Sequence, residues 1–210
     1  MKKQQSGFTL VEIAIVMVII GLLLGGVLKG QEVITNAKLK NVNNDFSGIS
    51  AAVYSYQDRY RALPGDDPAP VAHVGGTLSD GTVGTPGNGL IEGAFDVANV
   101  ALAVSNAESL LALHHLRAAG LISGSATGDT SNDQPNNALG GITGISTGDG
   151  AGGDENGITG LLIGFTNVDG DMAVILDSQN DDGADDTGNI RSRAGGGYTL
   201  TTVYNLVFAL

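Results

Sequence analysis

The sequence contains no cysteine, and lysine and arginine together account for only 10 of its 210 residues. Without cysteine there is no disulfide framework to stabilise the fold, and there is no thiol for redox chemistry. Aspartate and glutamate number 22, so the net charge is −12. A surface of this sign does not bind nucleic acid by neutralising phosphates, and it repels other anionic surfaces. We therefore expect an acidic protein with no direct nucleic-acid partner.

The common catalytic signatures are missing as well. There is no H-E-x-x-H, no G-x-S-x-G and no P-loop, and the glycine-rich stretches do not lie between a predicted strand and a predicted helix. His114 and His115 are neighbours on a predicted helix, so they point in different directions, and no second ligand pair follows at helical spacing. The sequence predicts no catalytic residues, no enzyme activity and no histidine metal site.

A long apolar run, residues 8–28, dominates the amino-terminal end and contains a single charged residue, Glu12. As a helix it would extend roughly 31 Å, which is enough to cross the hydrocarbon core of a bilayer. A cleaved secretory signal has a shorter apolar part with a small-residue cleavage site after it, whereas Gly7 stands before this run. Lys2 and Lys3 precede the run, so the positive-inside preference keeps this end cytoplasmic and places everything after the run across the membrane.

The leader MKKQQSG (residues 1–7), followed by FTLVE (residues 8–12) and an unbroken apolar helix, resembles the class III signal of type IV prepilins and pseudopilins. In that family a membrane peptidase cuts after the glycine and methylates the new terminal amine. The resemblance implies cleavage between Gly7 and Phe8, N-methylation of Phe8 and a mature chain of 203 residues. It also implies three kinds of partner: this peptidase, identical or related pilin subunits, and an assembly platform in the bacterial inner membrane.

Glu12 needs a partner or a use, because an ionisable side chain inside a membrane helix costs on the order of 3 kcal/mol. The resemblance implies that Glu12 pairs with the free amino terminus of a neighbouring subunit and so sets the stagger of assembly. The alternative is that Glu12 complements the positive end of its own helix, which is worth roughly 0.3–1 kcal/mol.

The helical pattern continues beyond the membrane segment. Apolar residues recur at spacings of three and four: Leu39, Val42, Phe46, Ile49, Val53, Tyr56 and Tyr60. Such a stripe is typical of a helix with one buried face. No proline or glycine pair interrupts residues 31–61, so we expect one helix over residues 8–61 that ends before Pro64. The stripe packs on the protein's own sheet or, alternatively, forms a coiled-coil seam with another protein.

The remaining residues predict a small antiparallel sheet among long loops. We expect surface loops over residues 65–93 and 123–157, the second with one short strand at 142–145, and a helix over 97–119. Residues 158–166 and 172–176 read as a hairpin, and residues 198–208 as a last strand. A long amino-terminal helix packed on such a sheet is the α+β architecture of pilins.

Five carboxylates lie between Asp177 and Asp186, in a segment expected to join the last two strands. They repel one another unless they are solvated or bridged by a cation. Calcium accepts clustered oxygen ligands, and some pseudopilins use it where others use a disulfide, but the spacing is not that of an EF-hand. We expect a solvated turn and no cofactor, with calcium as the alternative, and with Arg191 and Arg193 available to pair with the acids.

These features predict four parts: a leader (residues 1–7), a transmembrane half-helix (8–28), an amphipathic half-helix (29–61) and a globular head (62–210). The expected function is that of a structural subunit of an extracellular type IV pilus, inserted in the inner membrane as a precursor. The alternative is a pseudopilin of a type II secretion system, whose filament stays in the periplasm. The large loops favour the pilus, whereas the acidic loop and the missing cysteines favour the pseudopilin. A membrane-anchored binding protein would need the anchor alone, without Gly7 or Glu12.

Overall fold

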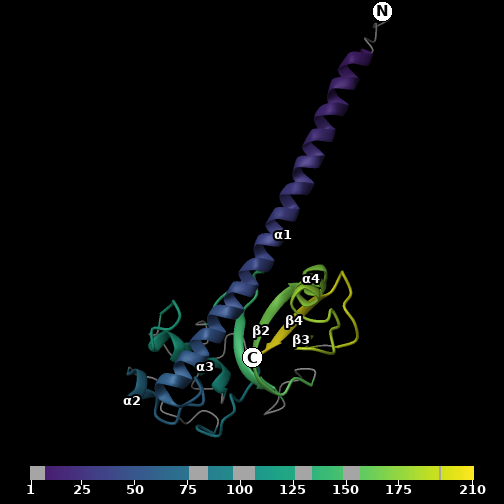
Figure 1. Ribbon diagram of the computed structural model, residues 1–210. Helices are drawn as coiled ribbons and strands as arrows, with labels where there is room; N and C mark the ends of the chain where they lie inside the picture. Colours follow the sequence, from purple (N-terminus) through teal and green to yellow (C-terminus); the bar gives the residue numbers. More distant parts are fainter. Residues whose placement is uncertain (1–7, 76–84, 97–106, 126–133, 149–156, 194) are drawn as a thin grey trace, which may run out of the picture. The chain divides into compact units, whose positions relative to one another are not determined.

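The computed structural model describes residues 8–75, 85–96, 107–125, 134–148, 157–193 and 195–210. The chain divides into two compact units, Met1–Lys40 and Asn41–Leu210. Helix α1, Leu10–Tyr60, begins in the first unit and ends in the second (Figure 1). The predicted helix over residues 8–61 is therefore confirmed.

In the first unit, the large apolar side chains of α1 from Leu10 to Ile34 are exposed, with Leu10 at 92% and Leu22 at 74% of their full accessible surface. This helix is long and apolar enough to cross a membrane. Gly21, Gly25 and Gly26 have open space around them, so they leave room for close approach of a neighbouring helix. No proline interrupts the helix, and its course is continuous.

In the second unit, the apolar stripe of α1 is buried as predicted. Val42, Ile49, Val53 and Tyr56 are at most 7% exposed, and Phe46 is half-buried. The Phe46 ring lies 5.2 Å from the ring of Phe208, which comes from the last strand, and Phe208 in turn meets Phe165 edge-on at 5.3 Å. The second half of α1 therefore packs on the sheet of its own chain, and the coiled-coil alternative is not needed to bury the stripe.

The sheet has four antiparallel strands in the order β1-β2-β4-β3. They are β1 Thr143–Gly148, β2 Gly160–Asp169, β3 Ile190–Ser192 and β4 Val203–Ala209. β2 and β4 form the centre, with Phe165 paired to Leu206, and a bulge shifts the register between Phe165 and Val168. The predicted α+β class, a long helix on a small antiparallel sheet, is confirmed.

Two glycines let an irregular segment cross the sheet. Gly144 on β1 and Gly164 on β2 are register partners. A Cβ at Gly164 would lie 2.0 Å from the Phe95 ring, and a Cβ at Gly144 would lie 2.1 Å from the Phe95 carbonyl oxygen. Phe95 is completely buried in this position. A side chain at either glycine would therefore displace the segment that carries Phe95.

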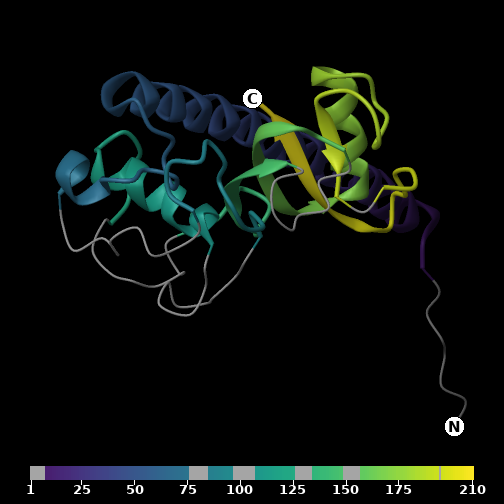
Figure 2. The ribbon, with the colours of Figure 1, turned by 90° about the horizontal axis from the view of Figure 1, so that it is seen from below.

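Two helices lie beside the sheet. α3, Glu108–Ala118, lies next to the edge strand β1, and α4, Gly170–Asn180, lies next to β2, β3 and β4 (Figure 2). A short helix, α2, Pro70–Val74, lies near α3. Ten of the eleven residues of α3 are buried, which includes both of its histidines.

The predicted hairpin at residues 158–176 is wrong in its second arm. β2 confirms the first arm, but residues 172–176 belong to α4. A short apolar run does not by itself distinguish a helix from a strand. Helical spacing buries Met172, Ala173 and Leu176 together, and β2 takes β1 and β4 as its partners instead. The acidic segment consequently begins in the last turn of α4 and leads to β3, which the sequence did not predict.

The predicted loops are less exposed than expected. Residues 65–93 contain α2, and Asp66, Asp67 and Ile91 are at most 3% exposed. The strand expected at 142–145 is present as β1, but it is longer and buried throughout. Thr147 is one reason, because its hydroxyl and amide both bond the backbone of Ile91. Residues 76–84, 126–133 and 149–156 lie outside the described residues.

Two predicted boundaries also change. α3 begins at Glu108, after an extended Ala107, and residues 97–106 of the predicted helix lie outside the described residues. The last strand begins at Val203 and not at residue 198. Residues 198–202 form a turn in which Thr199 donates its backbone N–H to the Tyr204 hydroxyl at 2.7 Å. That side-chain contact replaces the ladder bonds that a longer strand would make.

Candidate functional site

The amino-terminal motif is described from Phe8 onward, and Gly7 lies outside the described residues. Phe8 is 84% exposed and precedes the first helical residue, Leu10. The Thr9 N–H donates to Glu12 Oε2 at 2.7 Å, the Thr9 hydroxyl donates to the same oxygen at 2.8 Å, and the Glu12 N–H donates to the Thr9 hydroxyl at 3.3 Å. This reciprocal pattern is a capping box, which satisfies free amides at the start of a helix.

The capping box bears on the two roles considered for Glu12. In a single chain, Glu12 bonds the start of its own helix, as the alternative reading expected. Both hydrogen bonds use Oε2, and no hydrogen bond from the described part of the chain reaches Oε1. One carboxylate oxygen therefore remains open to a donor from another subunit. The two roles are geometrically compatible.

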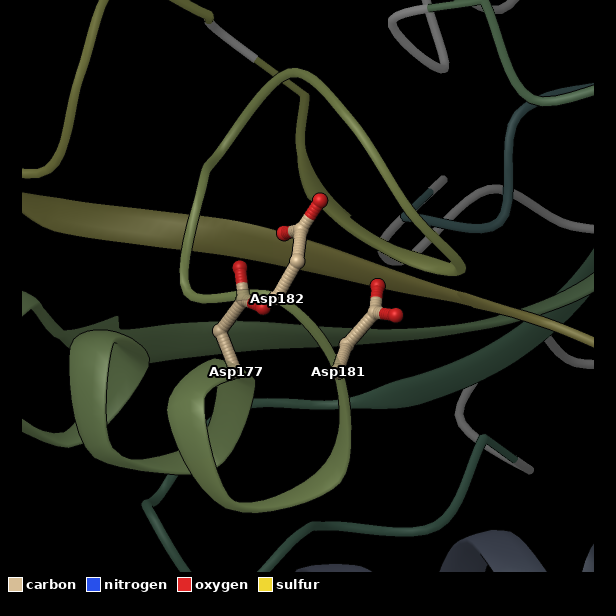
Figure 3. Close-up of side chains that lie close together, drawn as sticks. All are labelled: Asp177, Asp181 and Asp182. Carbon is tan, nitrogen blue, oxygen red and sulfur yellow. The ribbon is translucent and has the colours of Figure 1, made fainter.

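The acidic segment brings three carboxylates together. Asp177, Asp181 and Asp182 each offer an oxygen within 4.8 Å of the others, and their side chains lie on the same side of the turn (Figure 3). Asp177 is fully buried, Asp181 is half-buried and Asp182 is exposed. Aspartate oxygens at this separation suit calcium, which takes six to eight oxygen ligands.

Most of these oxygens already accept hydrogen bonds within the turn. Asp177 accepts from the Gly183 amide at 2.9 Å and from the Tyr198 hydroxyl at 2.7 Å. The other two carboxylates accept from Asn189, Ile190, Ala184 and Thr187. Only one of the six carboxylate oxygens, Asp181 Oδ1, accepts no hydrogen bond from the described residues. The cluster therefore organises the turn through hydrogen bonds within the chain.

The pKa values of two carboxylates in this turn shift in opposite directions. Burial raises the pKa of Asp177, and the charges of Asp181 and Asp182 raise it further, although the Tyr198 hydroxyl and the Gly183 amide oppose them. The hydrogen bond from the Thr187 hydroxyl lowers the pKa of the exposed Asp182. Asp182 therefore keeps its charge at neutral pH at the surface of the turn.

The two arginines near this turn have different partners. Arg193 forms an ion pair with Asp96, and its guanidinium lies 5.9 Å from the centre of the Phe95 ring. Arg191 Nε donates to the carbonyl of Gly188 at 3.0 Å. The expectation that both arginines pair with the acidic segment is therefore wrong for Arg193, which joins β3 to the segment crossing the sheet.

A second cluster of buried charged groups was not predicted, and it lies where α1 ends. Arg61 adopts a left-handed backbone with φ of 57°, and Pro64 follows. Gly65 then takes φ of 95° and donates its N–H to His115 Nδ1 at 3.0 Å. Because Nδ1 accepts this bond, the proton of the neutral ring is on Nε2. Burial lowers the pKa of His115 to about 4, so the ring is neutral at physiological pH.

Two adjacent carboxylates complete this cluster. Asp66 accepts from the backbone amides of three residues: Gly87, Asn88 and Gly89. Asp67 accepts from the Tyr56 hydroxyl at 2.6 Å and contacts His73 Nδ1 at 2.7 Å. Burial raises the pKa of Asp67, but the bonds from Tyr56 and His73 outweigh it and hold that pKa below its ordinary value. Two adjacent aspartates between Pro64 and Pro68 were the feature of the sequence that could have indicated this buried cluster.

In comparison with protein families, the prokaryotic N-terminal methylation motif matches residues 2–28. No curated protein and no solved structure matches the chain. The matched range contains Gly7, Phe8 and Glu12. This motif implies processing by a prepilin peptidase and assembly with other pilin subunits, and the apolar helix fits a membrane-anchored precursor. The motif matches the prepilin signal of type IV pilins and pseudopilins, and the α+β fold is pilin-like. Both observations support the type IV pilin or pseudopilin class, whose members are generally structural proteins.

Proposed function

We propose that the protein is a structural subunit of an extracellular type IV pilus. The observation that carries the proposal is the amino-terminal motif followed by one helix, α1, that runs from Leu10 to Tyr60. The apolar part holds the precursor in the inner membrane and then packs with the same part of other subunits. The second half of α1 is the core element of a head that lies outside the cytoplasm.

The proposal assigns a role to each of four parts. Residues 1–7 are removed at the Gly7–Phe8 bond, and Phe8 becomes the N-methylated terminus. Residues 8–28 span the membrane, residues 29–61 are the amphipathic half of the helix, and residues 62–210 are the head. The membrane assembly platform, together with the peptidase, receives the precursor before it enters the filament.

Glu12 is the proposed docking group of the incoming subunit. A carboxylate with one uncommitted oxygen accepts a strong, charge-assisted hydrogen bond from a protonated amine. The open Oε1 supports this role, because the Phe8 amine of a neighbouring copy can bind there while Oε2 keeps the capping box with Thr9. The docking would neutralise a charge that otherwise costs several kcal/mol in lipid.

A pseudopilin of a type II secretion system is the second candidate. It is favoured by the clustered carboxylates of Asp177, Asp181 and Asp182 in a chain without cysteine. Calcium at this turn would be consistent with such a role. A membrane-anchored binding protein is a third and weaker candidate, because it would need neither Gly7 nor Glu12.

Two measurements test the proposal. Filaments sheared from the cell surface should contain this protein as their main component, and its intact mass should equal that of residues 8–210 plus one methyl group. Protein found only in the periplasm, with loss of enzyme secretion when its gene is deleted, would favour the pseudopilin. A mass that still includes residues 1–7 would contradict the prepilin reading itself.

A further inference from the structure

Positive and negative charge are strongly segregated along this chain. Outside the leader there are only three lysines, Lys29, Lys38 and Lys40, and all of them fall within twelve residues of α1. Residues 62–210 carry three arginines against 18 aspartates and glutamates, a net charge of −15. We call residues 29–40 the lysine segment. Each copy of the chain therefore presents a short positive helix and a strongly negative head.

The lysine segment has little of its charge paired within its own chain. The Lys29 side chain is 70% exposed and pairs with Glu32 at 2.8 Å, which is also exposed. No salt bridge among the described residues involves Lys38 or Lys40. Val33 and Ile34, between the lysines, are 58% and 59% exposed. The lysine segment therefore combines cations with exposed apolar side chains.

Lys29, Val33 and Lys40 share one face of the helix, whereas Lys38, nine residues after Lys29, lies on the opposite face near Ile34. Residues that are four and then seven positions apart lie above one another on a helix, as Lys29, Val33 and Lys40 do. A face of this kind gains free energy when its apolar part is buried and its cations meet carboxylates.

We propose that the lysine segment docks on the acidic head of a neighbouring copy in the filament. The inference rests on the proposed filament function and names one of its subunit interfaces. Heads with a charge of −15 repel one another when they are brought close together. The lysine segment, in which Lys29 and Lys40 are exposed and Lys38 is half-buried, holds three of the cations with which a copy can offset that repulsion. Charge complementarity of this type speeds encounter and fixes the register of the partners.

The anionic surface of the membrane is the competing partner for the lysines, and helix geometry argues against it. Lys38 and Lys40 follow Leu28 by 10 and 12 residues, which places them roughly 15–18 Å further along the helix axis. The headgroup layer on each side of the hydrocarbon core is only about 5–7 Å thick. Lys29 lies within that layer, but the other two lysines lie beyond it. Their partner is therefore another protein surface, and the head of the same polymer supplies carboxylates at high density.

The head also offers suitable carboxylates at its surface. Asp182 and Asp186 are exposed on the turn that follows α4. The bonds that Asp182 accepts from the Thr187 hydroxyl and the Ala184 amide favour its ionised form. Fixed negative groups of this kind are good acceptors for lysine, because they need no rearrangement to bind.

The test uses the full chain in cells that assemble it. It measures the ratio of two amounts of this protein: the amount in filaments sheared from the cells and the amount that remains in the membrane, which we call the membrane pool. Lys38→Gln/Lys40→Gln should lower this ratio about tenfold, while Lys38→Arg/Lys40→Arg should retain it. Arg59→Gln/Arg61→Gln is the matched control, because it removes two exposed charges, one in the last turn of α1 and one just beyond its end, and should leave the ratio within about twofold. Isolated wild-type filaments should also dissociate more readily as salt rises from 0.05 to 0.5 M.

Three outcomes would overturn the inference. Normal filament yield from Lys38→Gln/Lys40→Gln, with unchanged salt sensitivity, would exclude the lysine segment as an interface while leaving the filament function intact. A loss of the membrane pool itself, at an unchanged ratio, would assign the lysines to the lipid surface instead. A wild-type chain that forms no filament under any condition would overturn the proposed function, and this inference with it.

Discussion

Glu108, a buried carboxyl group whose charge interacts with that of Asp66, provides a sharp test of the buried charges in the head. Its side chain is fully buried at the start of α3, Oε2 accepts the Glu92 N–H at 3.0 Å, and Oε1 has no partner among the described residues. Burial raises the pKa of Glu108 to about 7, and the nearby charges of Asp66 and Glu92 add to this, while the amides of Glu92 and Thr85 oppose it. The substitution to examine is Glu108→Gln, which keeps the shape and cannot ionise.

The direction in which pH changes the contribution of Glu108 to stability follows from the linkage between protonation and folding. Because the folded-state pKa lies above the ordinary value of 4.5, the folded protein holds this proton more tightly than the unfolded chain does. The stabilisation is complete below about pH 4.5 and is lost as the pH rises through about 7. The pKa shift of Glu108 corresponds to a change of roughly 3 kcal/mol in the free energy of unfolding. We expect about 2 kcal/mol, because the segment around residues 85–92 can relax toward solvent.

The assay is urea unfolding of a soluble fragment that begins at Lys29, at pH 4.5 and pH 8. The unfolding free energy of Glu108→Gln minus that of the wild type should increase by about 2 kcal/mol between the two pH values. Asp58→Asn removes a carboxylate whose side chain is 85% exposed, and it should show no such trend. Parallel pH profiles for Glu108→Gln and the wild type, within about 0.5 kcal/mol, would refute the assignment of a destabilising buried charge.

Three further predictions concern assembly, packing and metal binding. Glu12→Ala should insert in the membrane normally, because it removes an intramembrane charge, yet yield few filaments; a normal filament yield in a shearing assay would contradict the docking role. Phe46→Ala should lower the unfolding free energy by about 2–3 kcal/mol, less than for a fully buried ring, whereas the exposed Tyr54→Ala should change it by under about 0.5 kcal/mol. The fragment should melt at the same temperature in chelator and in millimolar calcium; a rise of several degrees with calcium, abolished by Asp181→Asn/Asp182→Asn, would establish the cation site.

The sequence predicted what depends on local pattern. The course of α1 follows from an uninterrupted apolar run and a stripe at spacings of three and four, and both survive in any tertiary context. The amino-terminal motif is equally local, because it is defined by residues 2–28 alone. For the same reason, its likeness to the prepilin signal could be recognised before the head was known.

The arrangement of the head was decided by tertiary contacts. Met172 and Leu176 are apolar enough for a strand or a helix, and the choice depended on which partners β2 found elsewhere in the chain. The polar β1 strand is buried in part because Phe95 lies across Gly144 and Gly164, a contact that spans about fifty to seventy residues. Sequence patterns carry no information about such distant partners.

The adjacent acids at Asp66 and Asp67 show the same limit most clearly. The sequence alone, with Gly65, Asp66, Asp67 and Pro68 in succession, indicated a turn and correctly placed the end of α1 before it. That the turn faces inward was decided by Tyr56, His73 and the amides of residues 87–89, which surround the two carboxylates from separate elements. A carboxylate is stable inside a protein only where such donors converge, and that convergence is a property of the folded chain and not of any single stretch of it.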